Sequence, residues 1–327
     1  MTLRVFWTVL CLGFLTIIVL QVLSPNVRPF GLPSSPIDLD KFPSEDVASF
    51  KLLHALKRDV YDIGIFGNSR VIGVRAEYVS DDRRSVFNFA VPGTSIRQSA
   101  VLIEDLARLD RLPRLSVVMI DNLALQYYSN PTYPGPVRRW RLAFDDILFG
   151  LQDKSIRWID LIRMAKRHAL IEWQSFSQTL NIHILKTRWI DWRFAASGST
   201  HYAADGSRTQ NHVSSPYVPQ TIDVVTTNLI PAYFLRDIRR LATIAGPDRL
   251  LIVETPLAPD VKDPMPATTN EIRNQLRMAC ASLGLRCVEP PPVTRNDLVW
   301  EDATHPPPEW FGAWIASHIS NAIDSSR

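Results

Sequence analysis

The sequence lacks the motifs of several large classes of protein. It has no Gly-x-Gly-x-x-Gly after its first predicted strand, which argues against a dinucleotide-binding domain. Its 7 histidines and 3 cysteines form no His-Glu-x-x-His motif and no paired metal-ligand spacing, so neither a metal site nor another cofactor is predicted. A net charge of +3 and the absence of any nucleic-acid-binding motif give no reason to expect a nucleic-acid partner.

One long apolar run is present at the amino terminus, where residues 5–23 carry no charged side chain. As a helix this run would measure roughly 29 Å, about the thickness of the hydrocarbon core of a bilayer. It predicts a transmembrane anchor over residues 1–24. A cleaved signal peptide is the alternative, but the run is longer than the usual apolar part of one, and Pro25 would follow the cut. The positive charges of Arg4 and the terminal amine favour a cytoplasmic amino terminus, which places the carboxyl-terminal domain on the outer side of the membrane.

The rest of the chain divides into a tether and one large domain. Residues 25–44 contain five prolines, which predicts a stiff, extended tether. Within residues 45–327, short apolar runs rich in Val, Ile and Phe alternate with helical patterns, as buried parallel strands and their crossover helices do. This alternation predicts an α/β fold, a doubly wound five-stranded parallel sheet of flavodoxin-like type. The expected strands are 61–67, 85–91, 115–121, 249–255 and 285–289, and the expected helices are 95–109, 220–245, 267–283 and 309–323.

A long insertion, residues 123–217, interrupts this alternation between the third and fourth strands. It holds an apolar helical region from about 144 to 185 and a polar loop with Asp205-Gly206, and it is expected to form a helical cap over the edge of the sheet that carries the site. Five of the nine tryptophans lie here, and residues 137–193 carry eleven Lys and Arg against six Asp and Glu. These side chains could bind sugars, an anionic polymer or a lipid surface, or they could fill the core and cover the outer face of the cap.

Cys280 and Cys287 lie seven positions apart, across a predicted helix end, a Gly turn and a strand. A disulfide between them is geometrically possible and would suit an oxidising compartment. Two separately buried thiols are the alternative, and the sequence leaves both open.

Candidate catalytic residues follow the predicted strands, because ligands in an open parallel sheet collect at the carboxyl ends of the strands. Ser69 comes after the first strand and is expected at the start of a helix, where backbone N–H groups could stabilise an oxyanion. Gly93 and Asn122, after the second and third strands, could donate further hydrogen bonds to that oxyanion. Each residue alone is equally explained as a helix cap or a turn former.

A second group lies near the carboxyl terminus. Asp302 and His305 are three residues apart, so the carboxylate could orient the imidazole, and the imidazole could take a proton from a serine. A cap residue and an idle loop histidine are the alternatives.

Together these residues resemble the SGNH (GDSL) hydrolase superfamily. Gly67-Asn68-Ser69-Arg70 is similar to its block I, Gly93 to block II, and Asp302 with His305 to block V, whereas Asp121-Asn122 lacks the glycine usual in block III and reverses its Asn-Asp pair. The form of block I resembles the membrane-anchored branch that modifies bacterial envelope polysaccharides, in which a large insertion after the third strand ends in an Asp-Gly element like Asp205-Gly206.

The resemblance implies a serine ester hydrolase or O-acetyltransferase. Ser69 would be the nucleophile, His305 the base and Asp302 its orienting carboxylate, and Ser69, Gly93 and Asn122 would form the oxyanion hole. Arg70 would either hold the surrounding loops together or meet an anionic group of the substrate. The implied partners are an envelope polysaccharide and a membrane acyl-donor protein, and the implied location is the inner membrane with the domain in the periplasm. A catalytically inactive subunit that binds polysaccharide is the alternative.

Overall fold

Five parallel strands form the centre of the protein, in the order β2-β1-β3-β6-β7. The computed structural model describes residues 47–56, 58–80, 84–120, 136–154, 156–180, 201–209, 231–256, 258, 266–289, 293, 300 and 305–324. The strands are β1 (Ile63–Phe66), β2 (Val86–Asn88), β3 (Leu115–Ile120), β6 (Leu250–Glu254) and β7 (Arg286–Val288). Each lies inside a run that the sequence predicts to be a strand, so the parallel α/β prediction is confirmed.

The helices around the sheet are α2 (Val47–Leu56), α3 (Ala76–Val79), α4 (Ile96–Arg108), α8 (Pro231–Ala245), α9 (Pro266–Leu283) and α10 (Pro308–Asp324), with a 3-10 turn, η4, at Pro247–Arg249. Three of them begin at a proline, whose missing N–H costs nothing in the first turn of a helix. The start of α4 is set by a capping box, in which the Ser95 side chain accepts from the Gln98 N–H and the Gln98 side chain accepts from the Ser95 N–H.

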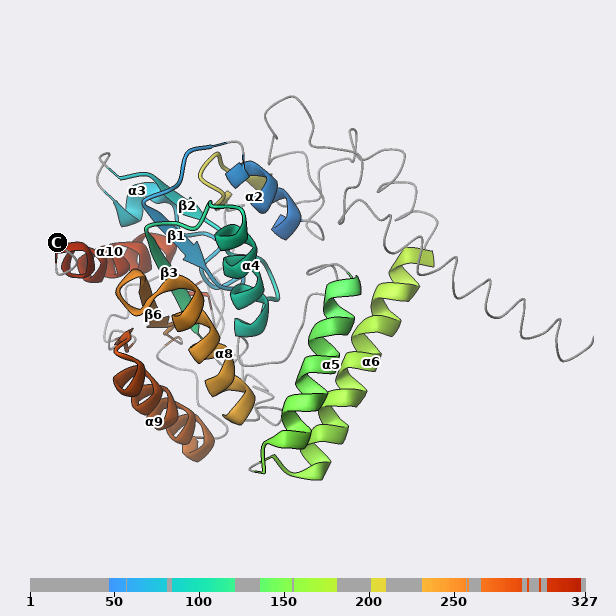
Figure 1. Cartoon of the computed structure of the whole chain (residues 1–327). Helices are drawn as coiled ribbons and strands as arrows, with labels where there is room; N and C mark the ends of the chain where they lie inside the picture. Colours follow the sequence, from blue (N-terminus) through green and yellow to red (C-terminus); the bar gives the residue numbers. More distant parts are fainter. Residues whose placement is uncertain are drawn as a thin grey trace, which may run out of the picture.

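The helices form two layers, one on each face of the sheet. Helix α3 packs with α10, whereas α8 packs with both α4 and α9 (Figure 1). Right-handed crossovers explain the division, because the step from β1 to β2 runs along the sheet in the opposite direction to all later steps. The strand order therefore reverses between β1 and β3, which is where open α/β sheets bind their ligands.

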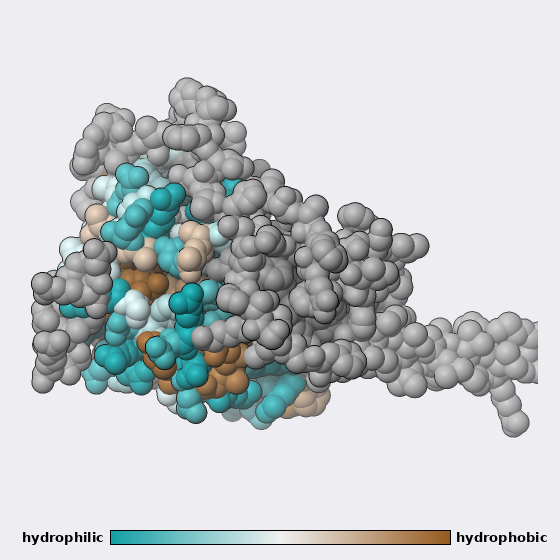
Figure 2. All heavy atoms as spheres, turned by 90° about the horizontal axis from the view of Figure 1, so that it is seen from above, coloured by the Kyte–Doolittle hydropathy of each residue, from teal (hydrophilic) through white to brown (hydrophobic). Residues whose placement is uncertain are grey.

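The core lies between these layers and the sheet. All residues of β1, β2 and β3 are buried, as parallel strands covered on both faces require. Aromatic rings pack at one end of it, with the Phe66 and Phe89 ring centres 5.0 Å apart and stacked. Seen from above, the described surface is mainly hydrophilic, with small apolar patches between the polar side chains (Figure 2).

The insertion contributes two long helices, α5 (Pro136–Gln152) and α6 (Trp158–Leu180), and a small antiparallel pair, β4 (His201–Tyr202) and β5 (Arg208–Thr209). The helical region predicted over 144–185 consists of two helices, because the chain turns back between Gln152 and Trp158, and residues 181–185 lie outside the described residues. The turn lets Leu161 and Met164 of α6 pack against Ile147 and Phe149 of α5, which buries apolar surface on both helices.

Helix α5 runs antiparallel to α4. Arg97 near the start of α4 pairs with Asp146 in the second half of α5, and Arg138 near the start of α5 pairs with Glu104 in the second half of α4. These two helices of the expected cap therefore extend the helical layer beside α4 and α8 (Figure 1). The ion pairs of α5 hold it against the side of α4, and the expectation that the insertion covers the edge of the sheet stays a prediction.

Two further predictions concern the cysteine pair and the amino-terminal segment. Cys280 at the end of α9 and Cys287 in β7 form a disulfide, with their Cα atoms 6.2 Å apart, which decides between the two alternatives. The predicted anchor (5–23) and tether (25–44) lie outside the described residues. Among the residues that are described, no helix is long and apolar enough to cross a bilayer.

Candidate active site

Ser69 lies half-buried in a turn directly after β1. Gly67 begins the turn, and a Cβ atom there would lie 2.9 Å from both Met119 Cβ and Val71 Cγ2, so only glycine fits. The Asn68 side-chain oxygen accepts from the Arg70 N–H at 3.0 Å and fixes the turn around Ser69.

The prediction that Ser69 starts a helix is wrong. Successive turns bring the Val71 N–H to the Asn68 carbonyl and the Ile72 N–H to the Ser69 carbonyl, and the next helix, α3, begins only at Ala76. The chain cannot continue as an α-helix here because other groups use its carbonyls. The Arg208 N–H donates to the Ile72 oxygen at 2.6 Å, and the Asn88 amide holds the Val71 and Val74 oxygens.

The loop after β2, which carries Gly93, is joined to the Ser69 turn through one carbonyl. The Gly67 oxygen accepts from the Val91 N–H at 2.9 Å, and the Thr94 hydroxyl lies 2.7 Å from the same oxygen. Gly93 sits between these two contacts, exposed and with a φ of 66°. Two of the predicted site residues, Ser69 and Gly93, thus lie on loops that share a hydrogen-bonded carbonyl at the end of β1, the strand beside which the strand order reverses.

Asn88, the last residue of β2, is a supporting residue that the sequence analysis did not identify. It is buried, and its amide nitrogen lies 2.8 Å from both the Val71 and the Val74 carbonyl oxygens, while its side-chain oxygen accepts from the Ala90 N–H. Both loops of the site are therefore held by one side chain. A polar residue inside the apolar run of residues 85–91 is the signal that could have revealed it.

Asp205 and Gly206 contact β2 and the start of α3, the two segments that hold the chain after the Ser69 turn. The Asp205 carboxylate accepts from the Ala76 N–H at 2.6 Å, at the start of α3, and its backbone oxygen accepts from the Asn88 N–H at 2.7 Å. Gly206 has a φ of +79°, and a Cβ atom there would lie 2.5 Å from the Asn88 carbonyl oxygen. The end of the insertion thus supports the candidate site, whichever activity the site has.

Arg70, beside Ser69, is buried. Its guanidinium lies 3.5 Å from the Thr255 hydroxyl, just after β6, and the Thr255 N–H donates to the Ile120 carbonyl at the end of β3. The side chain thus spans from the β1 turn to the end of β6. This contact supports the first of its two predicted roles, holding the loops at this edge together.

His305 precedes α10 and is half-buried. Helix α10 lies against the segment that continues from the Ser69 turn, since Gly312 leaves no space for a Cβ atom beside Tyr78 and the Tyr78 hydroxyl donates to Glu309 at 3.3 Å. The structure therefore brings the start of the His305 helix to the chain that leaves the Ser69 turn. Two predicted site residues, Asp302 and Asn122, lie outside the described residues.

Lys51 of α2 is a second supporting residue that sequence reasoning missed. It is completely buried, and its ammonium group donates to the Ala90 carbonyl at 2.6 Å and lies 5.1 Å from the centre of the Tyr202 ring. Burial lowers its pKa well below the ordinary value of 10.5, against the opposing effect of the Asp205 carboxylate. It joins α2 and β4 to the loop after β2. The apolar positions on either side of it in α2 were the available signal.

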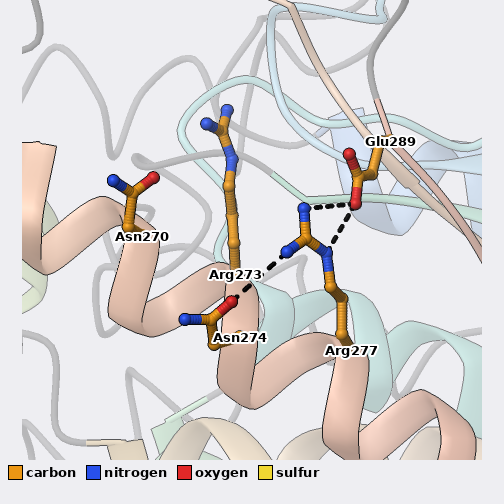
Figure 3. Close-up of a pocket in the computed structure, with 5 residues that line it drawn as sticks. All are labelled: Asn270, Arg273, Asn274, Arg277 and Glu289. Carbon is orange, nitrogen blue, oxygen red and sulfur yellow. Dashed lines mark hydrogen bonds and ion pairs between the residues drawn. The ribbon is translucent and has the colours of Figure 1, made fainter.

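A polar pocket of about 460 Å³ lies along α9 and beside Glu289, which directly follows β7 (Figure 3). Arg277 contacts Glu289 at 2.5 Å and Asn274 at 3.3 Å, and Arg273 donates to Glu254, the last residue of β6, at 2.6 Å. Guanidinium and amide donors beside carboxylate acceptors suit a ligand rich in hydroxyl groups. The full lining is Asn270, Arg273, Asn274, Arg277 and Glu289.

Comparison with protein families, curated proteins and solved structures gives no match for this chain. Within the described residues, no three His, Cys, Asp or Glu side chains gather as metal ligands would.

Proposed function

We propose that the protein is a serine esterase or O-acyltransferase of SGNH type that acts on an envelope polysaccharide. The observation that supports this most is the shared carbonyl of Gly67, which ties the Ser69 turn to the Gly93 loop. The Ser69 turn borders the point where the strand order reverses, the Gly93 loop lies one strand away, and a half-buried serine at this position is accessible to a substrate.

In the proposed reaction the Ser69 hydroxyl oxygen attacks the carbonyl carbon of an ester. His305 takes the hydroxyl proton, and Asp302 orients the imidazole. Backbone N–H groups of Ser69 and Gly93, with the Asn122 amide, stabilise the oxyanion. The bond to the leaving alcohol then breaks, His305 returns the proton to it, and an acyl-serine remains. Attack by water makes the protein an esterase, whereas attack by a sugar hydroxyl makes it a transferase.

The polar pocket supports a glycan as the substrate. In a parallel sheet all carboxyl ends lie on one edge, so the pocket and Ser69 are on the same side of the molecule. Because Glu289 of the pocket follows β7, which lies three strands from β1, the two features are separated by about 14 Å along the sheet. A polymer could contact both, with its ester at Ser69 and a neighbouring sugar in the pocket.

The test is the hydrolysis of p-nitrophenyl acetate by the full chain in detergent. We expect Ser69→Ala to lose roughly 10³-fold in kcat/KM, because an alanine side chain has no oxygen to attack the ester. Ser317→Ala is the matched control, since Ser317 is exposed on α10 and bonds within its own helix to the Trp314 carbonyl; it should leave turnover unchanged. Equal turnover by the Ser69→Ala chain and the wild type would refute the proposal.

A polysaccharide-binding subunit without activity is the second candidate, and the same pocket favours it because binding there needs no serine nucleophile. Stoichiometric labelling of Ser69 by a serine-reactive phosphonate would exclude this candidate. A chain that binds the polymer but is never labelled would instead support it.

A further inference from the structure

The hairpin of α5 and α6 exposes most of the large apolar side chains that the described surface contains. Nine such residues lie on it, whereas the other three, Val60, Leu109 and Met278, are scattered over different elements. Trp158 is 68% exposed and Phe144 61%. We call the nine the hairpin stripe: Trp140, Phe144, Leu148, Leu151, Trp158, Ile159, Ile162, Leu170 and Trp173.

Each helix carries its part of the stripe on one face. On α5 the residues recur at intervals of four, four and three, which places them on one side of the helix, away from the buried Leu142 and Asp146. On α6 Trp158 and Ile162 are similarly spaced, and the buried Leu161 and Met164 lie on the other side. Because the hairpin already buries its inner faces, these side chains are not needed for its own core.

The polar side chains beside the stripe are mainly cationic. Among the residues of α5, α6 and their connection whose exposure is described, the exposed carboxylate is Asp145. Five exposed cations outnumber it: Arg141, Lys154, Arg157, Arg163 and Lys166. Asp160 is half-buried and pairs with Arg157 and Arg163, so it offsets part of this charge. Apolar and aromatic residues bordered by Arg and Lys form the amphipathic pattern of a helix that lies on a bilayer.

We infer that the hairpin stripe binds the surface of an anionic lipid bilayer. Tryptophan suits the boundary between headgroups and acyl chains, and the five cations match anionic headgroups. If residues 5–23 span the bilayer as predicted, a tether of twenty residues could reach about 60 Å, far enough for the hairpin to meet the same membrane. The inference concerns a surface separate from Ser69 and does not depend on the proposed activity.

Docking on lipid would also orient the sheet. Asp146 pairs with Arg97 at the start of α4, and α5 continues six residues further, so the connection to α6 lies near the carboxyl ends of the strands. Because α4 runs antiparallel to α5, a hairpin lying on the bilayer would set α4 and its helical layer along the membrane surface.

The experiment places a fluorescent NBD group on the full chain, in a Cys11→Ser background in which Cys280 and Cys287 remain paired. Ile162→Cys carries the label on the stripe. Met278→Cys is the control, since Met278 is 64% exposed but lies on α9. Proteins are reconstituted into vesicles of phosphatidylcholine alone or with about a quarter phosphatidylglycerol.

With phosphatidylglycerol, we expect the label at 162 to shift its emission to the blue and to lose about fivefold in quenching by aqueous iodide. The label at 278 should show no change, and Arg157→Gln with Arg163→Gln and Lys166→Gln should abolish the response at 162. Equal quenching at 162 in both vesicle types would overturn the inference. A blue shift in detergent that grows with protein concentration would also overturn it, in favour of a second copy of the chain.

Discussion

Lys51 shows how one buried charge connects three parts of the protein. Its ammonium group has the Ala90 carbonyl and the Tyr202 ring as neighbours and is completely removed from solvent. Since burial lowers its pKa in the folded state, the folded protein binds fewer protons than the unfolded chain between that lowered pKa and 10.5. The contribution of Lys51 to the free energy of unfolding must therefore rise with pH across this window and level off above it.

We predict that the stability of the wild type relative to Lys51→Met increases between pH 7 and 10, by at most about 1.4 kcal/mol per pH unit. Urea unfolding of both proteins across this range measures the difference. Tyr61 and Tyr202, whose pKa values burial raises to about 12, are present in both proteins and cancel. Lys166→Met is the matched control, since it removes an exposed lysine side chain from α6. A flat difference for Lys51→Met would contradict the argument.

The turn between β4 and β5 illustrates what a short element contributes to the site. Gly206 has a positive φ and lies against the Asn88 carbonyl, so a side chain there is both strained and obstructed. Gly246, before η4, has a similar φ of +84° but nothing within 4 Å of a Cβ position. A substitution at Gly246 therefore reports the loss of stability from the backbone conformation alone. The same substitution at Gly206 adds the loss of stability from the contact with Asn88.

Gly246→Ala should lower the free energy of unfolding by about 1–2 kcal/mol, the cost of a left-handed conformation for a residue with a Cβ. Gly206→Ala should lower it by about 1–3 kcal/mol more, because the added methyl group also displaces Asn88. Urea midpoints measure both changes. Ester turnover should fall only for Gly206→Ala, since Asn88 holds both the turn that follows Ser69 and the loop after β2. Equal destabilisation by the two substitutions would show that the turn can move away from Asn88.

Buried ion pairs hold the helical insertion to the α/β domain across the whole molecule. Arg97 of α4 contacts Asp237 of α8 at 2.6 Å and Asp146 of α5 at 3.1 Å, and all three side chains are buried. Arg236 also pairs with Asp146. Burial raises the pKa of Asp237, and the Arg97 guanidinium opposes that rise. Removing Arg97 would therefore leave the negative charges of the buried Asp146 and Asp237 with fewer positive partners.

We expect Arg97→Met to lower the free energy of unfolding by about 3–5 kcal/mol at neutral pH. The loss should be smaller in acid, because a carboxyl with a raised folded pKa costs stability only as the pH rises above its unfolded value of about 3.8. Arg108→Met is the control. Its pair with Glu104 is 59% exposed on the arginine side and should contribute under about 1 kcal/mol. Thermal unfolding at pH 4 and pH 7 measures both, and equal losses for the two variants would refute the role of the buried cluster.

Several features of the protein follow from the sequence alone. The five strands and the main helices were predictable because a parallel strand buried on both faces needs a continuous apolar run, which is a local property. Candidate residues such as Ser69, Gly93 and His305 could be selected because catalytic groups follow strand ends in this kind of fold. The predicted roles of Asp302 and Asn122 stay predictions.

Only the tertiary structure decided how these pieces meet. The carbonyl of Gly67 joins two loops separated by more than twenty residues, and Asn88, Asp205 and Lys51 hold them from three different elements. The disulfide of Cys280 and Cys287 and the break between α5 and α6 were likewise settled by packing. The physical reason is that hydrogen bonds and ion pairs between distant residues depend on the relative position of whole elements, and no local pattern of the chain records that position.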